Sequence, residues 1–448
     1  MAKRKYETLQ DWYNRVYNEN MLISGVHTTS NHPAEITYQL TEACNLCCSY
    51  CYQIAKTPKR MSWEVAKRIT DYIFELSETD NPSPINKDTP WLIIDFIGGE
   101  PLLETELMSK ICHYFVDTAI EKNHRFALNF TISISSNGTL YFTPEFQKFL
   151  DDFVGHLSFS ISIDGDKEAH DACRIYPDGR GSFDDARRAQ LAFNQFTNQR
   201  SLETKATIAR ANLPYIDRII KYFASEGYEQ INANTVYEED WNLDDAKLYY
   251  SKLKEIADFN LARDEQIDIS LFVDNFFHEK VDKVQTWCGG YTSMLAFDPD
   301  GNAYPCIRYM PTSLGTDAPP IIIGDCWKGL YNSEAQKNLF KTLKAINWQT
   351  QNPKMCLECP IAEGCSDCAA ESYQRAGKLG VRNTSSCIMH KARSLANVYY
   401  WNTLYQKEGT NKVFEMHLPK EEALQIIGEE EYNKLVALVD AQKERLNK

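Results

Sequence analysis

The chain has 448 residues with 48 basic and 62 acidic side chains, so its formal net charge is −14. This length exceeds one ordinary domain, and we expect two or three. The acidic surplus argues against a nonspecific nucleic-acid binder, because neutralising phosphates needs clustered Lys and Arg. No apolar run approaches the roughly 18 residues of a membrane span, and the N-terminus lacks a secretory signal. The composition therefore predicts a soluble, cytoplasmic protein without a nucleic-acid or membrane partner.

Strand and helix patterns alternate over the first two thirds of the chain. Residues 1–34 show no core pattern and form a separate N-terminal segment. Strand patterns then occur at 35–41, 91–97, 127–135, 157–163, 204–210 and 230–236. Helical periodicity follows each strand, beginning with the helix that Ser62 caps. The other helical patterns cover 103–121, a segment from Thr143-Pro144, 183–196, 213–226 and 243–261.

This alternation predicts an α/β fold with parallel strands and helical crossovers. Six units suggest a partial, TIM-like (β/α)6 barrel over residues 35–280, with its site at the carboxyl ends of the strands. From about residue 281 cysteines become dense and strands short. We expect a cysteine-rich domain at 281–395 and a charged helical C-terminal extension at 396–448.

Fourteen cysteines stand out in a chain without an export signal. Twelve of them lie in two groups, at 44–51 and at 288–387. In a cytosolic protein such clusters are more often metal ligands than disulfides. Cys44, Cys48 and Cys51 follow the first strand and suit three irons of a 4Fe–4S cluster, which leaves the fourth iron open. Cys47 offers an alternative register, and a zinc site is the competing hypothesis.

Polar residues follow the next three strands at the edge where a barrel site would lie. Gly98 and Gly99 allow close backbone approach to a ligand, and the Glu100 carboxylate can hold an ammonium group. After the third and fourth strands come polar side chains that can contact ribose and carboxylate groups. These are Ser136, Asn137, Ser162, Asp164 and Arg174. Nearby, we expect His170 to be a structural hydrogen-bonding residue, and Cys112 and Cys173 to be packed thiols.

These segments, in this order, resemble the radical S-adenosylmethionine superfamily. The resemblance rests on Cys44-x3-Cys48-x-Tyr50-Cys51, on Gly98-Gly99-Glu100-Pro101, and on the Ser162-x-Asp164-Gly165…Arg174 run. It implies that the three cysteines ligate a 4Fe–4S cluster whose open iron chelates S-adenosylmethionine. Reductive cleavage then gives a 5′-deoxyadenosyl radical that abstracts a hydrogen atom. It also implies cofactor contacts from Tyr50 and from the strand-end residues, with Glu100 holding the methionine amino group. Cys47 departs from the usual pattern and is expected to be a bystander.

The second cysteine group resembles the SPASM extension of these enzymes. Its spacing is Cys288-x12-Gly301-x4-Cys306, then Cys356-x2-Cys359-x5-Cys365-x2-Cys368, then Cys387. The family usually has three residues before the cysteine that corresponds to Cys368. The resemblance implies an inner auxiliary cluster on Cys288, Cys306 and Cys368 and an outer one on Cys356, Cys359, Cys365 and Cys387. Cys326 is a candidate fourth ligand of the inner cluster; the alternative is an open iron for substrate. Three 4Fe–4S clusters follow, although two zinc ions would need the same eight thiols.

SPASM enzymes mostly act on peptides or proteins, so the resemblance implies a peptide maturase that installs a thioether or other crosslink. In overall length and layout the chain looks like the maturases of cysteine-repeat peptides. An electron donor of flavodoxin or ferredoxin type is implied. Either a separate protein presents the leader peptide, or the N-terminal segment pairs with it through an edge strand. Two other enzymatic hypotheses stay open: a formylglycine-generating sulfatase maturase, and a radical dehydrogenase of a sugar or small alcohol. Sulfatase maturases carry an aspartate, a proposed base, directly after the second SPASM cysteine. Here Ile307 follows Cys306, which disfavours the first of these hypotheses. A zinc-binding scaffold is the non-enzymatic alternative.

Overall fold

The computed structural model describes residues 33–80, 83–197, 203–273, 290, 293–362 and 365–446. Two compact units account for the chain, and each is described by itself. Unit 1 comprises 1–45, 52–162 and 288–345, and unit 2 comprises 46–51, 163–287 and 346–448. Almost all of the N-terminal segment, and Cys288, lie outside the described residues. The boundaries expected at 34, 280 and 395 stay predictions.

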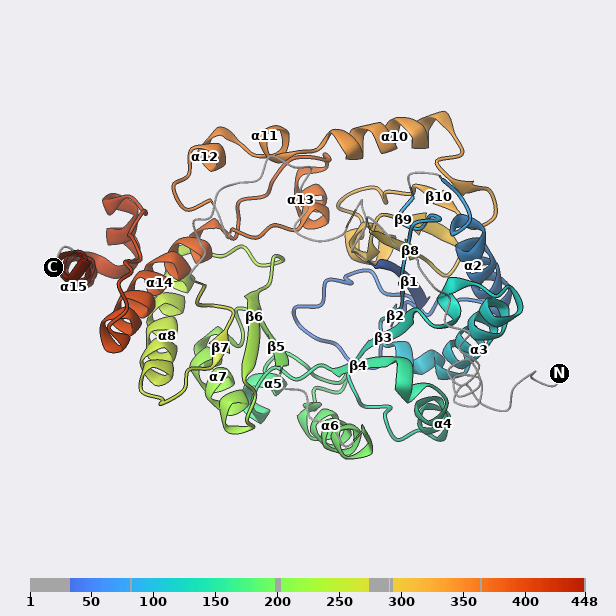
Figure 1. Cartoon of the computed structure of the whole chain (residues 1–448), viewed down its shortest axis with the longest axis horizontal. Helices are drawn as coiled ribbons and strands as arrows, with labels where there is room; N and C mark the ends of the chain where they lie inside the picture. Colours follow the sequence, from blue (N-terminus) through green and yellow to red (C-terminus); the bar gives the residue numbers. More distant parts are fainter. Residues whose placement is uncertain are drawn as a thin grey trace. The chain divides into compact units, whose positions relative to one another are not determined.

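Unit 1 is built on four parallel strands in the order in which they occur in the chain (Figure 1). They are β1 (Ala34–Thr41), β2 (Leu92–Gly98), β3 (Phe130–Ser136) and β4 (Leu157–Ile161). Helices follow the first three: α2 (Trp63–Leu76), α3 (Thr105–Glu121) and α4 (Pro144–Phe153). Ser62 caps α2, as expected, because its hydroxyl accepts from Val65 N at 3.2 Å. Pro144 opens α4, also as expected. These are strand–helix units of the kind that the alternating pattern predicted.

The two faces of this parallel sheet differ in chemistry. One face is apolar, with Ile36, Tyr38, Ile94, Phe96 and Ile132 buried. Since successive side chains alternate between faces, the other face carries the intervening residues, many of which are polar although Ile93 and Ile97 of β2 are among them. These include Glu35, Thr37 and Gln39 on β1, Asp95 on β2, and Ser133 and Ser135 on β3. A parallel sheet is usually apolar on both faces, so this polar face is unusual.

Short strands extend the same sheet beyond β1. β8 (Met294–Phe297) pairs parallel with β1, and β9 (Asn302–Tyr304), β10 (Gly324–Asp325) and β11 (Gly329–Leu330) follow in antiparallel order. The turn between β8 and β9 contains Gly301, whose φ of 83° favours glycine. The remaining elements of unit 1 are mostly single turns. They are α9 (Pro311–Leu314), α10 (Glu334–Ala345), and the 3-10 turns η1 (Pro101–Glu104), η2 (Arg125–Ala127), η3 (Val154–His156) and η5 (Ile307–Tyr309).

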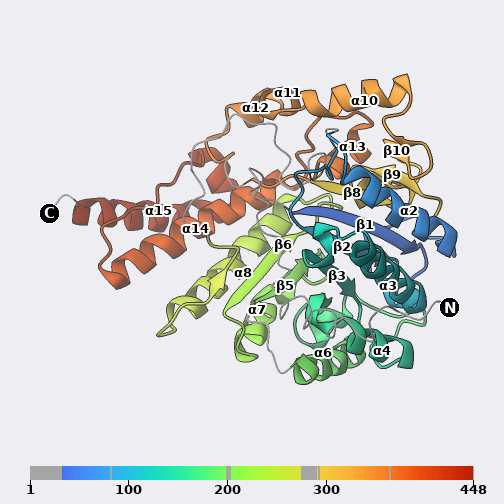
Figure 2. The same cartoon turned by 45° about the vertical axis from the view of Figure 1, so that its right-hand side comes forward.

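Unit 2 has a smaller parallel sheet of β5 (Glu203–Ile208), β6 (Gln230–Thr235) and β7 (Asp268–Ile269). Its longer helices are α6 (Phe183–Thr197), α7 (Ile216–Ser225), α8 (Leu243–Leu261), α14 (Cys387–Glu408) and α15 (Lys420–Leu446). α8 and α14 lie side by side in both views (Figure 2). The shorter elements are α5 (Lys167–Asp171), η4 (Leu213–Tyr215), α11 (Trp348–Gln351), α12 (Lys354–Leu357) and α13 (Ala369–Ala376).

The parallel α/β architecture and all six expected strands are confirmed, but the described strands form two sheets and no closed barrel. The first sheet ends at β4, which has only five residues. In unit 2, the β5 amide of Thr207 donates to the Asp164 carboxylate at 3.1 Å. A side chain therefore satisfies a backbone group that another strand would satisfy in a continuous sheet. No helix in the described residues is long and apolar enough to cross a membrane.

Candidate active site

The end of β2 packs tightly against the loop that follows β1, and this explains its two glycines. A Cβ on Gly98 would lie 2.8 Å from the carbonyl oxygen of Thr41. On Gly99 it would lie 2.2 Å from the carbonyl oxygen of Ala43 and 2.7 Å from Cβ of Cys44. Both approaches are impossible for any larger residue. The sequence predicted close backbone approach here, and in the structure this neighbour is the loop that carries Cys44.

Glu100, which follows these glycines, is buried with its carboxylate among several donors. Oε1 accepts from Leu102 N at 3.1 Å and from the Ser136 hydroxyl at 2.7 Å. Oε2 accepts from Asn137 N at 2.8 Å. Neutral donors to both oxygens favour the ionised carboxylate and fix its direction. The structure thus brings together the predicted residues Glu100, Ser136 and Asn137, while Ser162 N donates to Ser136 O at 2.9 Å.

The other part of the cysteine loop, residues 46–51, belongs to unit 2 and is attached to the segment after α5. Cys47 N donates to Ile175 O at 2.7 Å, and Ser49 N donates to Cys173 O at 2.9 Å. Cys48 and Cys51 are partly exposed, whereas the Cys47 side chain is exposed. Cys173 is buried, and burial raises the pKa of its thiol to about 11. It is a packed thiol, as the sequence suggested.

Tyr50, Asp164 and Arg174 form one polar cluster in unit 2. The Tyr50 hydroxyl donates to Asp164 Oδ2 and accepts from Arg174 Nη1 at 2.7 Å. Arg174 Nη1 lies 3.9 Å from Asp164 Oδ2. Burial lowers the pKa of Arg174, but Tyr50, Asp164 and Cys48 outweigh burial and raise it, so the guanidinium is charged. Its Nε is buried without a hydrogen-bond partner, which leaves one donor for a ligand.

His170 supports this cluster as a neutral residue. Asp164 N donates to its Nδ1 at 3.3 Å, and Nε2 lies 3.0 Å from the Ser182 hydroxyl, which donates to Arg174 O. Nδ1 is therefore an acceptor and Nε2 carries the proton. Burial, followed by the charge of Arg174, lowers the pKa of His170 to about 3. The expected structural role agrees with this geometry.

Four cysteines of the second group line one cavity of about 270 Å³ in unit 2. They are Cys356, Cys359, Cys365 and Cys387, the set expected to ligate the outer auxiliary cluster. Burial, with smaller contributions from Cys387, Cys356 and Cys359, raises the pKa of Cys365 to about 11, although Arg382 lowers it. Such mutual repulsion is relieved when a cation or cluster binds the thiolates. In the residues described, no three Cys, His, Asp or Glu side chains are grouped closely enough for one metal ion.

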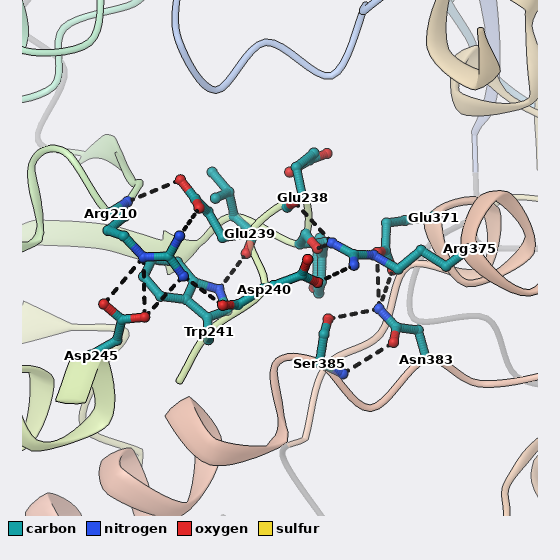
Figure 3. A network of polar contacts seen from close by, with 12 residues as sticks. Arg210, Glu238, Glu239, Asp240, Trp241, Asp245, Glu371, Arg375, Asn383 and Ser385 are labelled. Atoms are coloured by element: carbon teal, nitrogen blue, oxygen red, sulfur yellow. Dashed lines mark hydrogen bonds and ion pairs between the residues drawn. The ribbon is translucent and has the colours of Figure 1, made fainter. Parts of the chain in front are cut away.

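A network of ion pairs fixes the cysteine-rich segment to the loop after β6 (Figure 3). On one side, Arg375 of α13 donates to Tyr237 O at 3.2 Å and to Glu238 O at 2.9 Å, and pairs with Asp240 and Glu371. On the other, Arg210 donates to Asp240 O at 2.6 Å and pairs with Glu239 and Asp245. Tyr237 also hydrogen-bonds to Ser366, between Cys365 and Cys368. The loop is thereby held from both sides.

The remaining cysteines are placed separately. Cys306 is buried in unit 1. Cys326 is also buried there, next to Gly301, where a Cβ would lie 2.6 Å from its Sγ. Cys368 is partly exposed in unit 2. Their assignment to an inner cluster stays a prediction.

Sequence reasoning missed three functional candidates. Arg382 donates to Cys365 Sγ at 3.1 Å, but a lone arginine 17 residues from its target gives no sequence signal. Glu35 and Asp95 share the polar sheet face, where Thr37 donates to Asp95 Oδ2 at 3.2 Å. Burial raises the pKa of Asp95 to about 6, and burial with the nearby Asp95 raises that of Glu35 to about 7. Alternation with apolar residues was a signal for Glu35, and a charged residue inside the apolar run Leu92–Ile97 was a signal for Asp95.

Sequence comparisons place this arrangement among known proteins. A protein-family model described as "4Fe-4S single cluster domain" matches residues 37–174. An uncharacterized protein of Methanocaldococcus jannaschii is 28% identical over 60% of this chain and 82% of its own length. The cysteine-type anaerobic sulfatase-maturating enzyme of Clostridium novyi is 24% identical over 68% of this chain and 82% of its own length. The mycofactocin maturase of Mycolicibacterium smegmatis is 23% identical over 76% of this chain and 79% of its own length.

Solved structures share the fold. Native anSMEcpe with bound AdoMet and Cp18Cys peptide has a TM-score of 0.60 and 19% identity, and the match covers 85% of this chain and all of that one. Streptococcus suis SuiB bound to the precursor peptide SuiA has a TM-score of 0.50 and 12% identity, with 86% and 82% covered. The fold therefore extends over most of the chain.

Proposed function

Because this chain belongs to the radical S-adenosylmethionine enzymes with a SPASM extension, we propose that it modifies a ribosomally made peptide through hydrogen abstraction. When bound, the first cluster and S-adenosylmethionine supply the 5′-deoxyadenosyl radical that this chemistry needs. Cys44, Cys48 and Cys51 would hold that cluster. The observation that carries the proposal is Arg174, a charged and largely buried guanidinium within electrostatic reach of Cys48 whose Nε has no partner.

The described residues of each unit suit one charged group of S-adenosylmethionine. In unit 1, Glu100 is a buried, oriented carboxylate that suits the methionine ammonium. In unit 2, the unpartnered Nε of Arg174 suits the methionine carboxylate, and Tyr50 and Asp164 hold the guanidinium in place. Gly98, Gly99, Asn137 and Ser162 complete the set of proposed contacts. His170 keeps the loop of Asp164 in position and moves no proton in this scheme.

The outer cavity supports an auxiliary 4Fe–4S cluster on its four cysteines. We place a second auxiliary cluster on Cys288, Cys306, Cys368 and Cys326, which gives three clusters in all. External electrons for reductive cleavage would come from a flavodoxin or ferredoxin. Zinc in the same cysteines is the alternative, and it would leave the protein colourless and without iron.

A peptide substrate is supported by the solved structures with bound peptides and by the two maturases among the relatives. Thioether or other crosslinking fits better than formylglycine formation, because Ile307 replaces the aspartate expected after Cys306. The likeness to a sulfatase-maturating enzyme keeps formylglycine formation as the second candidate.

The decisive experiment uses the anaerobically reconstituted enzyme with a chemical reductant. Wild type is expected to form 5′-deoxyadenosine from S-adenosylmethionine, and the variant with Cys44, Cys48 and Cys51 changed to Ala is expected to form none. The matched control is Cys47→Ala, which should retain the first cluster's paramagnetic signal and its activity. Deoxyadenosine from the triple variant would refute the assignment. Conversion of Cys in the Cp18Cys peptide to formylglycine, followed by mass spectrometry, would favour the second candidate.

A further inference from the structure

Arg382 lies between α13 and α14 and points into the outer cysteine cavity. We propose that it positions the Cys365 thiolate and sets the reduction potential of the auxiliary cluster there by supplying a buried positive charge. This inference rests on the proposed function insofar as the four cysteines hold an iron–sulfur cluster. Nothing in the spacing of the cysteines requires an arginine at this place.

The guanidinium is fixed by hydrogen bonds to two segments of the chain, Cys365-Ser366 and Asn352. Nη2 donates to Cys365 O at 2.7 Å, to Cys365 Sγ at 3.1 Å and to Ser366 O at 3.2 Å. Nη1 donates to Asn352 Oδ1 at 3.3 Å. The Trp348 ring, whose centroid is 5.7 Å from the guanidinium carbon, lies beside it. The donor to the sulfur therefore has a fixed direction.

In the described part of the chain no carboxylate lies within ion-pair distance of Arg382, although its charge reaches Asp367, where it lowers a pKa that burial raises. The side chain is 7% exposed, and its hydrogen-bond acceptors are carbonyl oxygens, an amide oxygen and a thiol. Asp367, which follows Ser366, accepts from the Ser372 hydroxyl at 2.8 Å. A buried cation is costly unless a counter-charge is near. With a cluster bound, the four cysteines would be thiolates, and the cluster with its ligands would carry the net negative charge that balances Arg382.

Lys391 is a natural comparison because it lines the same cavity one turn after Cys387. Its Nζ lies 2.6 Å from Glu422 Oε2, so its charge is already balanced by a carboxylate. Of these two cations, Arg382 donates a hydrogen bond to a cysteine sulfur, whereas Lys391 is paired with Glu422 and acts on Cys387 through its charge. We therefore expect Arg382 to affect the cluster more than Lys391 does.

The expected effect follows from the charge that reduction adds. Uptake of one electron from a mediator makes the cluster more negative by one charge, and a nearby cation and an N–H···S bond favour that state. Removing them should lower the potential. We expect about a tenfold fall in the ratio of reduced to oxidised cluster at a fixed potential, which for one electron is about 59 mV.

The test uses the full chain with Cys44, Cys48 and Cys51 changed to Ala, so that only auxiliary clusters remain. Arg382→Gln, Arg382→Lys and Lys391→Gln are compared in this background by iron content and by redox titration followed by paramagnetic resonance. Arg382→Gln should keep its iron and shift one component to lower potential. Arg382→Lys should shift that component less, and Lys391→Gln should shift it least.

Each outcome is decisive. Unchanged potentials in Arg382→Gln with full iron content would overturn the inference, as would a larger shift in Lys391→Gln. If Arg382→Gln loses the outer cluster, Arg382→Lys decides: a retained cluster with a potential equal to or slightly below wild type supports the inference, because the charge is kept, and a potential above wild type or loss of the cluster in this variant too overturns it. A background protein that takes up zinc and no iron would instead refute the proposed clusters, and this result is separate from any effect of Arg382.

Discussion

Neighbouring groups fix the direction of both the Glu100 carboxylate and the Arg174 guanidinium, but the two side chains differ in the hydrogen-bonding capacity that they retain. The Glu100 carboxylate accepts from three protein donors, whereas Arg174 retains an unpartnered Nε. In Glu100→Gln the amide oxygen can still accept from Leu102 N and Ser136. Its NH2 group would then face Asn137 N, so this variant loses the charge and one hydrogen bond. Arg174→Gln removes the charge and the free donor together.

We predict that Glu100→Gln and Arg174→Gln each raise the S-adenosylmethionine concentration for half-maximal cleavage by about tenfold to a hundredfold, with iron content unchanged. Charge-assisted contacts contribute roughly 1.5–3 kcal/mol, and about 1.4 kcal/mol is a factor of ten. Anaerobic titration with measurement of 5′-deoxyadenosine checks this. The controls are Glu104→Gln, which removes a carboxylate paired with Arg60, and Arg218→Gln, which removes a cation paired with Asp166. Unchanged half-saturation in both test variants would remove these residues from the cofactor site.

The site residues that could be predicted from sequence are those that follow a strand. Glu100 was identifiable because parallel strands end at one edge, so residues just beyond them gather there. Arg382 was not identifiable, because its contact with Cys365 depends on how an irregular segment folds back. The same limit applies at the level of elements. Alternation located all six strands, but it did not show that they belong to two sheets, because the period of a strand does not specify its neighbour.

Among the elements, α13 is joined to the loop after β6 by the side chain of Arg375. Loss of this side chain would leave the Glu371 carboxylate, 3% exposed, with Asn383 as a remaining donor. We predict that Arg375→Gln destabilises this segment by on the order of 2 kcal/mol, because a buried carboxylate loses its ion pair. Since α13 directly follows Cys368, the variant should also bind less iron.

Arg210→Gln is the matched control, because Arg210 holds the same loop from its other side and does not contact α13 (Figure 3). It should lower the unfolding temperature while leaving iron content at the wild-type value. Iron content and thermal unfolding of reconstituted proteins separate the two effects. Equal iron loss in both variants would show that the loop, not the contact of Arg375 with α13, determines cluster binding.

At the scale of the whole molecule, buried titratable groups in the two units make the stability of the folded protein depend on pH in opposite directions. In unit 2, burial and then Arg174 lower the pKa of His170 to about 3, so stability from its neutral form is lost as pH falls below about 6.5. In unit 1, burial raises the pKa of Asp95 to about 6 and, with Asp95, that of Glu35 to about 7. A carboxyl with a raised folded-state pKa favours folding only while protonated. Its contribution is therefore present at low pH and is lost as pH rises from about 4 through about 7.

Asp95→Asn should remove most of this loss, because the amide oxygen can still accept from Thr37 and no charge has to be buried. We predict that the variant is more stable than wild type by about 1–3 kcal/mol at pH 8 and equally stable near pH 4, since one pKa unit corresponds to about 1.4 kcal/mol. Unfolding temperatures of both proteins between pH 4 and pH 8 measure the difference, in which the histidine contributions cancel. Asp80→Asn, at an exposed carboxylate paired with Lys87, should give no pH-dependent gain. If Asp95→Asn is less stable than wild type at pH 8, the prediction is wrong. The Asp95 carboxylate would then be stabilised in the folded protein by a positively charged group on the polar face of the sheet.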